Sequence, residues 1–126
     1  WPLGWDQRGG IIAFCDVEKK PPVQLEWDMK LWWPQCEAII ANLMAYKIFG
    51  EEKYNDNYKM LLKYAFDNFA DTKNGEWYGY LHKDGTVSHT QKGSMWKGPF
   101  HHPRFLMCCE YILSCLEEGK PVVTLL

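Results

Sequence analysis

The sequence predicts a mainly α-helical globular domain in which short β-hairpins separate the helices. Three stretches carry apolar residues at steps of three and four positions, the spacing that buries one face of a helix. Prolines near the start of two stretches and glycines after their ends are typical of helix boundaries. Two segments rich in aromatic and β-branched residues flank turn-forming glycines, which indicates the hairpins.

The first hairpin is expected within the first twenty residues. Residues 6–10 have the composition of a turn, and the apolar run over residues 11–14 predicts a short strand. The first helix is then expected over residues 34–49, with Pro34 at its first position and Gly50 as its C-terminal cap. This assignment places two tryptophans at the mouth of the helix and Glu37 in its first turn.

A second, antiparallel helix is expected over residues 52–70, ending before the Asn74-Gly75 pair. Residues 77–88 predict the second hairpin, because two β-prone runs flank Asp84-Gly85. A loop over residues 92–100 leads to the last helix, expected over residues 103–118. The order hairpin then helix therefore occurs twice, as in a helical solenoid or toroid.

Composition excludes several classes of function. The chain of 126 residues is 47% apolar and 16% aromatic, which excludes a disordered tract, and its net charge of -2 offers no basic surface for nucleic acid or anionic membranes. The longest apolar stretch, residues 37–49, is too short to span a bilayer. Five cysteines without a C-x-x-C pair favour reduced, buried thiols in a cytoplasmic protein.

The richest candidate site lies at residues 97–104, where two histidines and two cations precede or open a helix. The helix dipole disfavours an imidazolium at this end, so a histidine there stays neutral and can accept a proton, as a general base must. The alternative is structural: one histidine caps the helix and the other packs on Pro99 or Phe100.

A second candidate site lies at residues 30–37. The adjacent Trp32 and Trp33 cannot both point into one helical core, so one is expected to line a cleft, where an indole face suits the C–H face of a sugar. Glu37 alone on a helix is usually a solvated carboxylate or a carboxylate in the first turn. No metal is expected, because the histidines and cysteines lack the spacing of a zinc site, and Cys108 and Cys109 are expected in the core. No phosphate-binding glycine motif is present in the sequence.

Both candidate sites belong to longer motifs that resemble the C-terminal third of the N-acylglucosamine 2-epimerase family. The resemblance covers residues 4–113 and rests on L-E-W-x-M-K-L-W-W-P, G-E-W-x-G-Y-L and K-G-x-x-x-K-G-x-F-H-x-P-R, in this order. Pro99, His102 and Phe105 depart from residues that are common in the family. None of these departures removes an ionisable group that the family chemistry requires.

The resemblance implies an (α/α)6 barrel, a toroid of twelve helices with the active site at one end. Residues 1–126 would form a C-terminal segment with about a quarter of these helices and without the N-terminal part of the barrel. The implied reaction interconverts N-acyl-D-glucosamine and N-acyl-D-mannosamine by removing and returning the proton at C2. Two histidines share this work; His101 corresponds to one, and the other is expected upstream of this chain, so the isolated chain is expected to be inactive.

The resemblance also assigns roles to other residues of the two sites. Glu37 matches the family's active-site glutamate, and Trp32 and Trp33 match its aromatic wall. Lys97 matches a polar position that faces the sugar, where a cation would stabilise the enolate oxygen. Arg104 matches as well, in a substrate-binding or purely structural role.

The expected partner is a small amino sugar, and no cofactor is expected to be required. A nucleotide as allosteric effector and a homodimer of the full-length protein are further expectations from the family. Three alternatives stay open: a disaccharide 2-epimerase, an aldose–ketose isomerase, and a non-catalytic interaction module, since vertebrate members of the family also bind renin.

Overall fold

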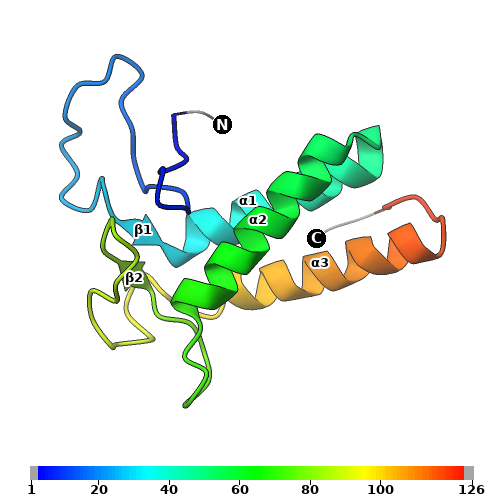
Figure 1. Ribbon diagram of the computed structural model, residues 1–126. Helices are drawn as coiled ribbons and strands as arrows, with labels where there is room; N and C mark the ends of the chain where they lie inside the picture. The colour runs from blue at the N-terminus through cyan, green and yellow to red at the C-terminus, as the bar shows by residue number, and fades with distance from the viewer. Residues whose placement is uncertain (1–2, 124–126) are drawn as a thin grey trace.

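The computed structural model describes residues 3–123, which form three helices and one two-stranded sheet (Figure 1). The elements in chain order are β1 (Lys30–Leu31), α1 (Trp32–Phe49), α2 (Glu52–Phe69), β2 (Tyr80–Leu81) and α3 (His101–Glu117). α1 packs against both α2 and α3. α1 and α3 begin at the same end of the molecule, on the left in Figure 1, and α2 runs back between them in the sequence. This arrangement confirms the expected order of two helices in the same direction with a returning helix between them.

Both α1 and α3 begin two residues before the proline that was expected to be their first residue. Pro34 is the third residue of α1 and Pro103 is the third residue of α3. The first N–H groups of a helix have no partner within the helix, so proline is tolerated throughout the first turn and does not mark its first residue. Both tryptophans and both histidines are therefore helical, and Glu37 lies in the second turn of α1. The cap at Gly50 is confirmed, with the left-handed φ of 69° that glycine favours.

The hairpins are shorter than predicted, and one pairing was missed. β1 pairs with β2 in antiparallel register, a contact between segments far apart in the sequence. The hairpin expected over residues 77–88 retains one bridge, between Leu81 and Val87. The hairpin expected in the first twenty residues is likewise reduced to one bridge, and the strand at residues 11–14 does not form. The N–H groups of Ala13 and Phe14 instead donate to the carbonyls of Met29 and Trp27.

Two buried polar side chains attach the loops to the start of α1. Gln35 is fully buried; its amide donates to the carbonyl of Ile11 at 2.7 Å and accepts from the N–H of the same residue at 2.9 Å. The ammonium of Lys30, also fully buried, donates to the Lys83 carbonyl at 2.6 Å and lies 3.5 Å from Asp6. Hydrogen bonding of this kind offsets the cost of burying polar groups. The N-terminal segment and the 82–86 turn are therefore both held at the end of the molecule where α1 begins.

The hydrophobic core lies between the helices. Its fully buried members include Cys36 and Ile39 of α1, Leu61 and Phe69 of α2, and Ile112 of α3. The five cysteines, all within the described residues, form no disulfide, and all except Cys15 are buried, as the sequence predicted for Cys108 and Cys109. Burial raises the pKa of the Cys36 and Cys109 thiols to about 12.

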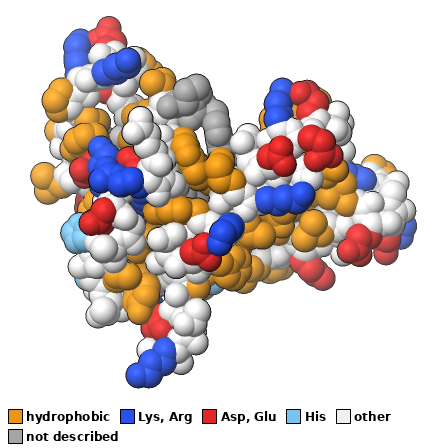
Figure 2. All heavy atoms as spheres, in the orientation of Figure 1, with side chains coloured by type: hydrophobic (Ala, Val, Ile, Leu, Met, Phe, Trp, Pro, Cys, Tyr) orange, Lys and Arg blue, Asp and Glu red, His pale blue; other side chains and the backbone are white. Residues whose placement is uncertain are grey.

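Large apolar side chains also remain exposed on every helix. They form an extended band over the helices on the face shown in Figure 2. The exposed residues include Ile48 and Phe49 on α1, Met60 and Phe66 on α2, and Leu106, Met107 and Leu113 on α3. Among the described residues, no helix is both long and apolar enough to cross a membrane.

Candidate functional site

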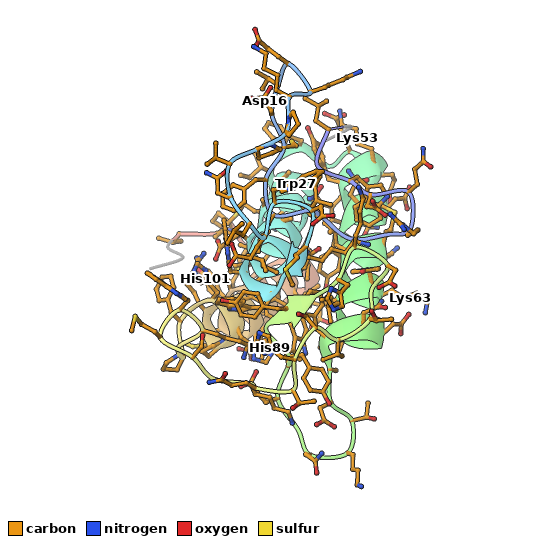
Figure 3. The ribbon with its side chains drawn as sticks, turned by 90° about the vertical axis from the view of Figure 1, so that its left-hand side faces the viewer. Asp16, Trp27, Lys53, Lys63, His89 and His101 are labelled. Atoms are coloured by element: carbon orange, nitrogen blue, oxygen red, sulfur yellow. The ribbon has the colours of Figure 1, made fainter. Side chains whose placement is uncertain are left out.

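The N-terminal ends of α1 and α3 bring together the central residues of the two candidate sites. Nδ1 of His101 lies 2.8 Å from Oε1 of Glu37, and the Arg104 guanidinium donates to the other oxygen of the same carboxylate. Figure 3 views the molecule toward this end, with His101 at the start of α3. The side chains of His101, Glu37 and Arg104 are each about one-third exposed. The structure therefore places the predicted glutamate and histidine in one solvent-accessible cluster.

The electrostatics of this cluster keep Glu37 ionised. Burial alone would raise the pKa of Glu37, but hydrogen bonds from His101 and Arg104 and the guanidinium charge hold that pKa below its ordinary value. An ionised carboxylate can only accept hydrogen bonds, so Nδ1 of His101 carries the proton. In the neutral ring, Nε2 then keeps its lone pair. This tautomer is the one that a general base needs.

Aromatic side chains surround the His101 ring. The Trp33 ring centroid lies 5.7 Å away at a tilt of 37°, and the Phe100 ring meets it edge-on at 4.9 Å. Phe100 is 62% exposed, and the Arg104 guanidinium lies over its ring. Trp33 is partly exposed, whereas Trp32 is only 3% exposed and packs against Tyr80. Of the two adjacent tryptophans, Trp33 is therefore the one accessible to a ligand.

Lys97 lies in a different cluster. Its ammonium donates to Oε1 of Glu76 at 3.1 Å, and its side chain is 5% exposed. Nδ1 of His102 lies 3.1 Å from the same oxygen, and the His102 ring packs on Trp77 with centroids 4.6 Å apart. A pocket of about 460 Å³ borders this second cluster. The structure thus pairs Lys97 with Glu76, and no contact of its ammonium with Glu37 or His101 is recorded.

The structural alternative for the histidine pair holds only in part. Phe100 does meet a histidine ring, but it is the ring of His101, whereas His102 packs on Trp77. Neither histidine is a cap, because the residue before α3 is Phe100 and no side chain caps this helix. Sequence reasoning assigned no role to Glu76, although it belongs to one of the quoted motifs. Its contact with His102 joins distant segments and leaves no local pattern.

A bound metal ion requires several ligand side chains that lie close together. Within residues 3–123, no group of three or more histidine, cysteine or acidic side chains gathers as metal ligands would. The expectation that no metal or cofactor is required stays a prediction.

Comparisons with known proteins place this geometry in context. The family described as N-acylglucosamine 2-epimerase (GlcNAc 2-epimerase) matches residues 2–104. N-acylglucosamine 2-epimerase of Rattus norvegicus is 46% identical over 116 residues, which cover 91% of this chain and 28% of the relative. Cellobiose 2-epimerase of Eubacterium cellulosolvens is 33% identical over 91 residues, which cover 71% of this chain and 22% of the relative.

A solved structure of a D-mannose isomerase superposes with a TM-score of 0.74 at 22% identity, covering 88% of this chain and 28% of that protein. This likeness shows the fold, and the expected class, part of an (α/α)6 barrel, is confirmed. The chain spans little more than a quarter of the length of the curated N-acylglucosamine 2-epimerases that it matches.

Proposed function

Because the chain belongs to the N-acylglucosamine 2-epimerase family, we propose that residues 1–126 supply the C-terminal helices of an (α/α)6 barrel and one half of its acid–base machinery. The whole protein would interconvert N-acyl-D-glucosamine and N-acyl-D-mannosamine. The observation that carries this proposal is the 2.8 Å contact between Nδ1 of His101 and Glu37, since it leaves Nε2 as a base at the accessible end of the helices.

In the proposed reaction, the sugar is bound in its open-chain form with the aldehyde at C1. Nε2 of His101 takes the proton from C2, and the electron pair of that C–H bond forms the C1–C2 double bond of an enolate while the negative charge moves to the aldehyde oxygen. A second group outside this chain, protonated at this stage, acts as a general acid and delivers its proton to the opposite face of C2. The aldehyde re-forms and the configuration at C2 is inverted; the reverse reaction exchanges the two roles.

The neighbouring residues support this chemistry in distinct ways. Glu37 fixes the tautomer and orientation of His101 and stabilises the imidazolium that forms, and Arg104 holds the other carboxylate oxygen. The partly exposed indole of Trp33 offers a face to the C–H groups of the sugar. Trp32 supports this wall from the core. A role for Lys97 at the enolate oxygen requires its ammonium to leave Glu76 when substrate binds.

A chimeric enzyme tests the proposal. The 116 aligned residues of the Rattus norvegicus relative are replaced by those of this chain, and incorporation of solvent deuterium at C2 of N-acetylmannosamine is measured. The chimera should be active, and His101→Asn should abolish exchange on at least one face. His102→Gln, which keeps a hydrogen-bonding group beside Glu76, should retain most activity. An active His101→Asn chimera would refute the assignment.

The same chimera distinguishes the alternatives. Relatives named cellobiose 2-epimerase and D-mannose isomerase match this chain at 33% identity. Turnover of a disaccharide, or formation of a ketose from an aldose, in preference to C2 inversion of the amino sugar would favour one of those reactions. An inactive chimera that is correctly folded would favour a non-catalytic interaction module, for which the exposed apolar side chains would provide a surface.

The remaining expectations concern location, assembly and regulation. We propose a cytoplasmic protein, supported by five cysteines that form no disulfide in the described part of the chain. A homodimer of the whole protein and a nucleotide effector are proposed from the family resemblance alone. Sedimentation of the chimera with and without a nucleotide, together with rates at both conditions, tests these two proposals.

A further inference from the structure

The first turn of α3 carries two adjacent histidines, and each faces a carboxylate through Nδ1. His101 contacts Glu37 on α1 at 2.8 Å, and His102 contacts Glu76 in the segment between α2 and β2 at 3.1 Å. The start of α3 thus lies between two carboxylates from separate parts of the chain. The proposed reaction uses only the first of these contacts, so the second requires its own explanation.

Glu76 is held in an unusual conformation. Its φ is 64°, in the left-handed region that residues with a side chain rarely adopt. The segment aims the carboxylate at three groups: Oε1 accepts from the Trp77 N–H at 2.7 Å and from the Lys97 ammonium at 3.1 Å, and it faces His102. Burial would raise the pKa of Glu76, but these hydrogen bonds and charges lower it, so the side chain stays ionised.

The contacts of Glu76 tie two neighbours of His101 to the same segment. Lys97, four residues before His101, runs over Gly79, where a Cβ would lie only 3.0 Å from the Lys97 Cδ. The His102 ring packs between Trp77 and Phe105, at centroid distances of 4.6 and 5.7 Å. No side chain caps the N-terminus of α3, so its first turn is held by this cluster, by the Glu37 contact and by the aromatic rings around His101.

We propose that Glu76 is a positioning residue for His101, acting through Lys97 and His102. The inference rests on the proposed function, in which Nε2 of His101 must meet the C–H bond at C2. A misplacement of about 1 Å can lower a rate by about 10²-fold, so a carboxylate that fixes the residues on both sides of His101 affects catalysis without touching the substrate.

Glu76→Gly and Glu76→Gln test the proposal. Glycine adopts a φ of 64° without steric cost, so Glu76→Gly removes the carboxylate and also removes the backbone strain at this position. Glu76→Gln keeps an oxygen that accepts from Lys97 and Trp77. Glu110→Gln, at an exposed carboxylate further along α3, is the matched control. The imidazole nitrogen resonances of the ¹⁵N-histidine-labelled full chain report the tautomer of His101, and melting curves report folding.

Glu76→Gly should move the two nitrogen resonances of His101 toward each other, because the ring no longer holds one tautomer, and should lower kcat for C2 exchange in the chimera by about 10- to 100-fold with little change in KM. Glu76→Gln and the control should keep the resonances and most of the rate. Lys97→Met, which keeps the aliphatic stem, should shift the resonances part of the way.

Unchanged His101 resonances and an unchanged rate in folded Glu76→Gly would overturn the proposal, as would an equal effect of Glu76→Gln. Inactivity of the unsubstituted chimera would instead count against the proposed function, while the resonances in the full chain still decide the role of Glu76.

Discussion

Glu37 and His101 lie 64 positions apart in the sequence, yet Oε1 of the first and Nδ1 of the second are separated by 2.8 Å. The contact exists because α1 and α3 begin at the same end of the molecule and α1 packs directly against α3. It couples the fold to the proposed chemistry: any change that separates these two helix ends also releases the tautomer of the base.

Glu37→Gln should lower C2 exchange in the chimera by about 10²-fold. A glutamine amide presents either an N–H or an oxygen to Nδ1, so it does not enforce the tautomer with a free Nε2, and it leaves Arg104 without its carboxylate. Deuterium incorporation at C2 measures the effect, with Glu110→Gln as the matched control. A variant as fast as the unsubstituted chimera would show that the contact has no catalytic role.

Stability of the chain should fall as the pH decreases below about 6.5, with a contribution from His102. Burial lowers the pKa of His102. The negative charge of Glu76 partly offsets this shift, and the positive charge of Lys97 adds to it. Below the ordinary pKa of histidine, about 6.5, the unfolded chain therefore binds more protons than the folded chain. The free energy of unfolding consequently decreases as the pH is lowered. Glu37 and Glu76, whose pKa values are also lowered, contribute only in the more acidic range below their ordinary 4.5.

Urea unfolding at a series of pH values measures this dependence. His102→Gln cannot titrate, so its free energy of unfolding should decline less steeply just below pH 6.5 than that of the unsubstituted chain. Equal slopes for the two proteins would contradict the assignment to His102.

In the native chain, only Cys15 should react rapidly with a thiol reagent. It is the exposed cysteine, whereas the other four are buried, and burial raises the pKa of Cys36 and Cys109 to about 12. Ellman's reagent should report one fast thiol per folded chain and five in guanidinium chloride. The variant Cys15→Ser should lose the fast phase; its persistence would mean that a second thiol is accessible.

Gly10→Ala should destabilise the chain by about 1–3 kcal/mol more than Gly50→Ala. Both glycines have left-handed φ values, 77° and 69°, so the backbone cost is similar. A Cβ at Gly10 would lie 2.4 Å from a ring carbon of Tyr64, whereas a Cβ at Gly50 meets nothing within 4 Å. Thermal or urea unfolding of the two variants isolates the contact with Tyr64, and equal destabilisation would exclude it.

The isolated chain should bind a hydrophobic dye or self-associate. Met107 on α3, Phe49 on α1 and Phe66 on α2 are 70%, 63% and 46% exposed, which leaves apolar surface on every helix. Dye fluorescence and sedimentation compare the chain with the chimera, in which further barrel helices would cover part of this surface. A monodisperse chain with no dye binding would identify a self-sufficient domain.

The helices were predictable because their signals are local. Apolar spacing and the Gly50 cap placed α1 and α2 within two residues of their observed ends. The pairing of β1 with β2 was not predictable, since two residues are too few to show a period of two and their partner is remote in the sequence. The prolines predicted helix starts that are two residues later than the observed ones, because proline is accepted at every position of a first turn.

The site was predictable in its residues but not in all of its contacts. The family motifs indicated Glu37 and His101, and the structure joins them. The ion pair of Lys97 with Glu76 escaped prediction, because nothing local shows that Gly79 lets the lysine stem pass toward that carboxylate. The burial of Trp32 rather than Trp33 depends on Tyr80, which the missed strand pairing brings to α1.

The pairing of Lys30–Leu31 with Tyr80–Leu81 also has a consequence for how the chain folds. α1 and α2 adjoin through Gly50, so their contact closes only a short loop, whereas the β1–β2 ladder must close a long one, which costs more chain entropy and forms more slowly. The helix pair should therefore gain amide protection first in pulse-labelled hydrogen exchange. Pairing of β2 with β1 then brings the segment that leads to α3 close to α1. His101 should therefore contact Glu37 only in the last stage of folding.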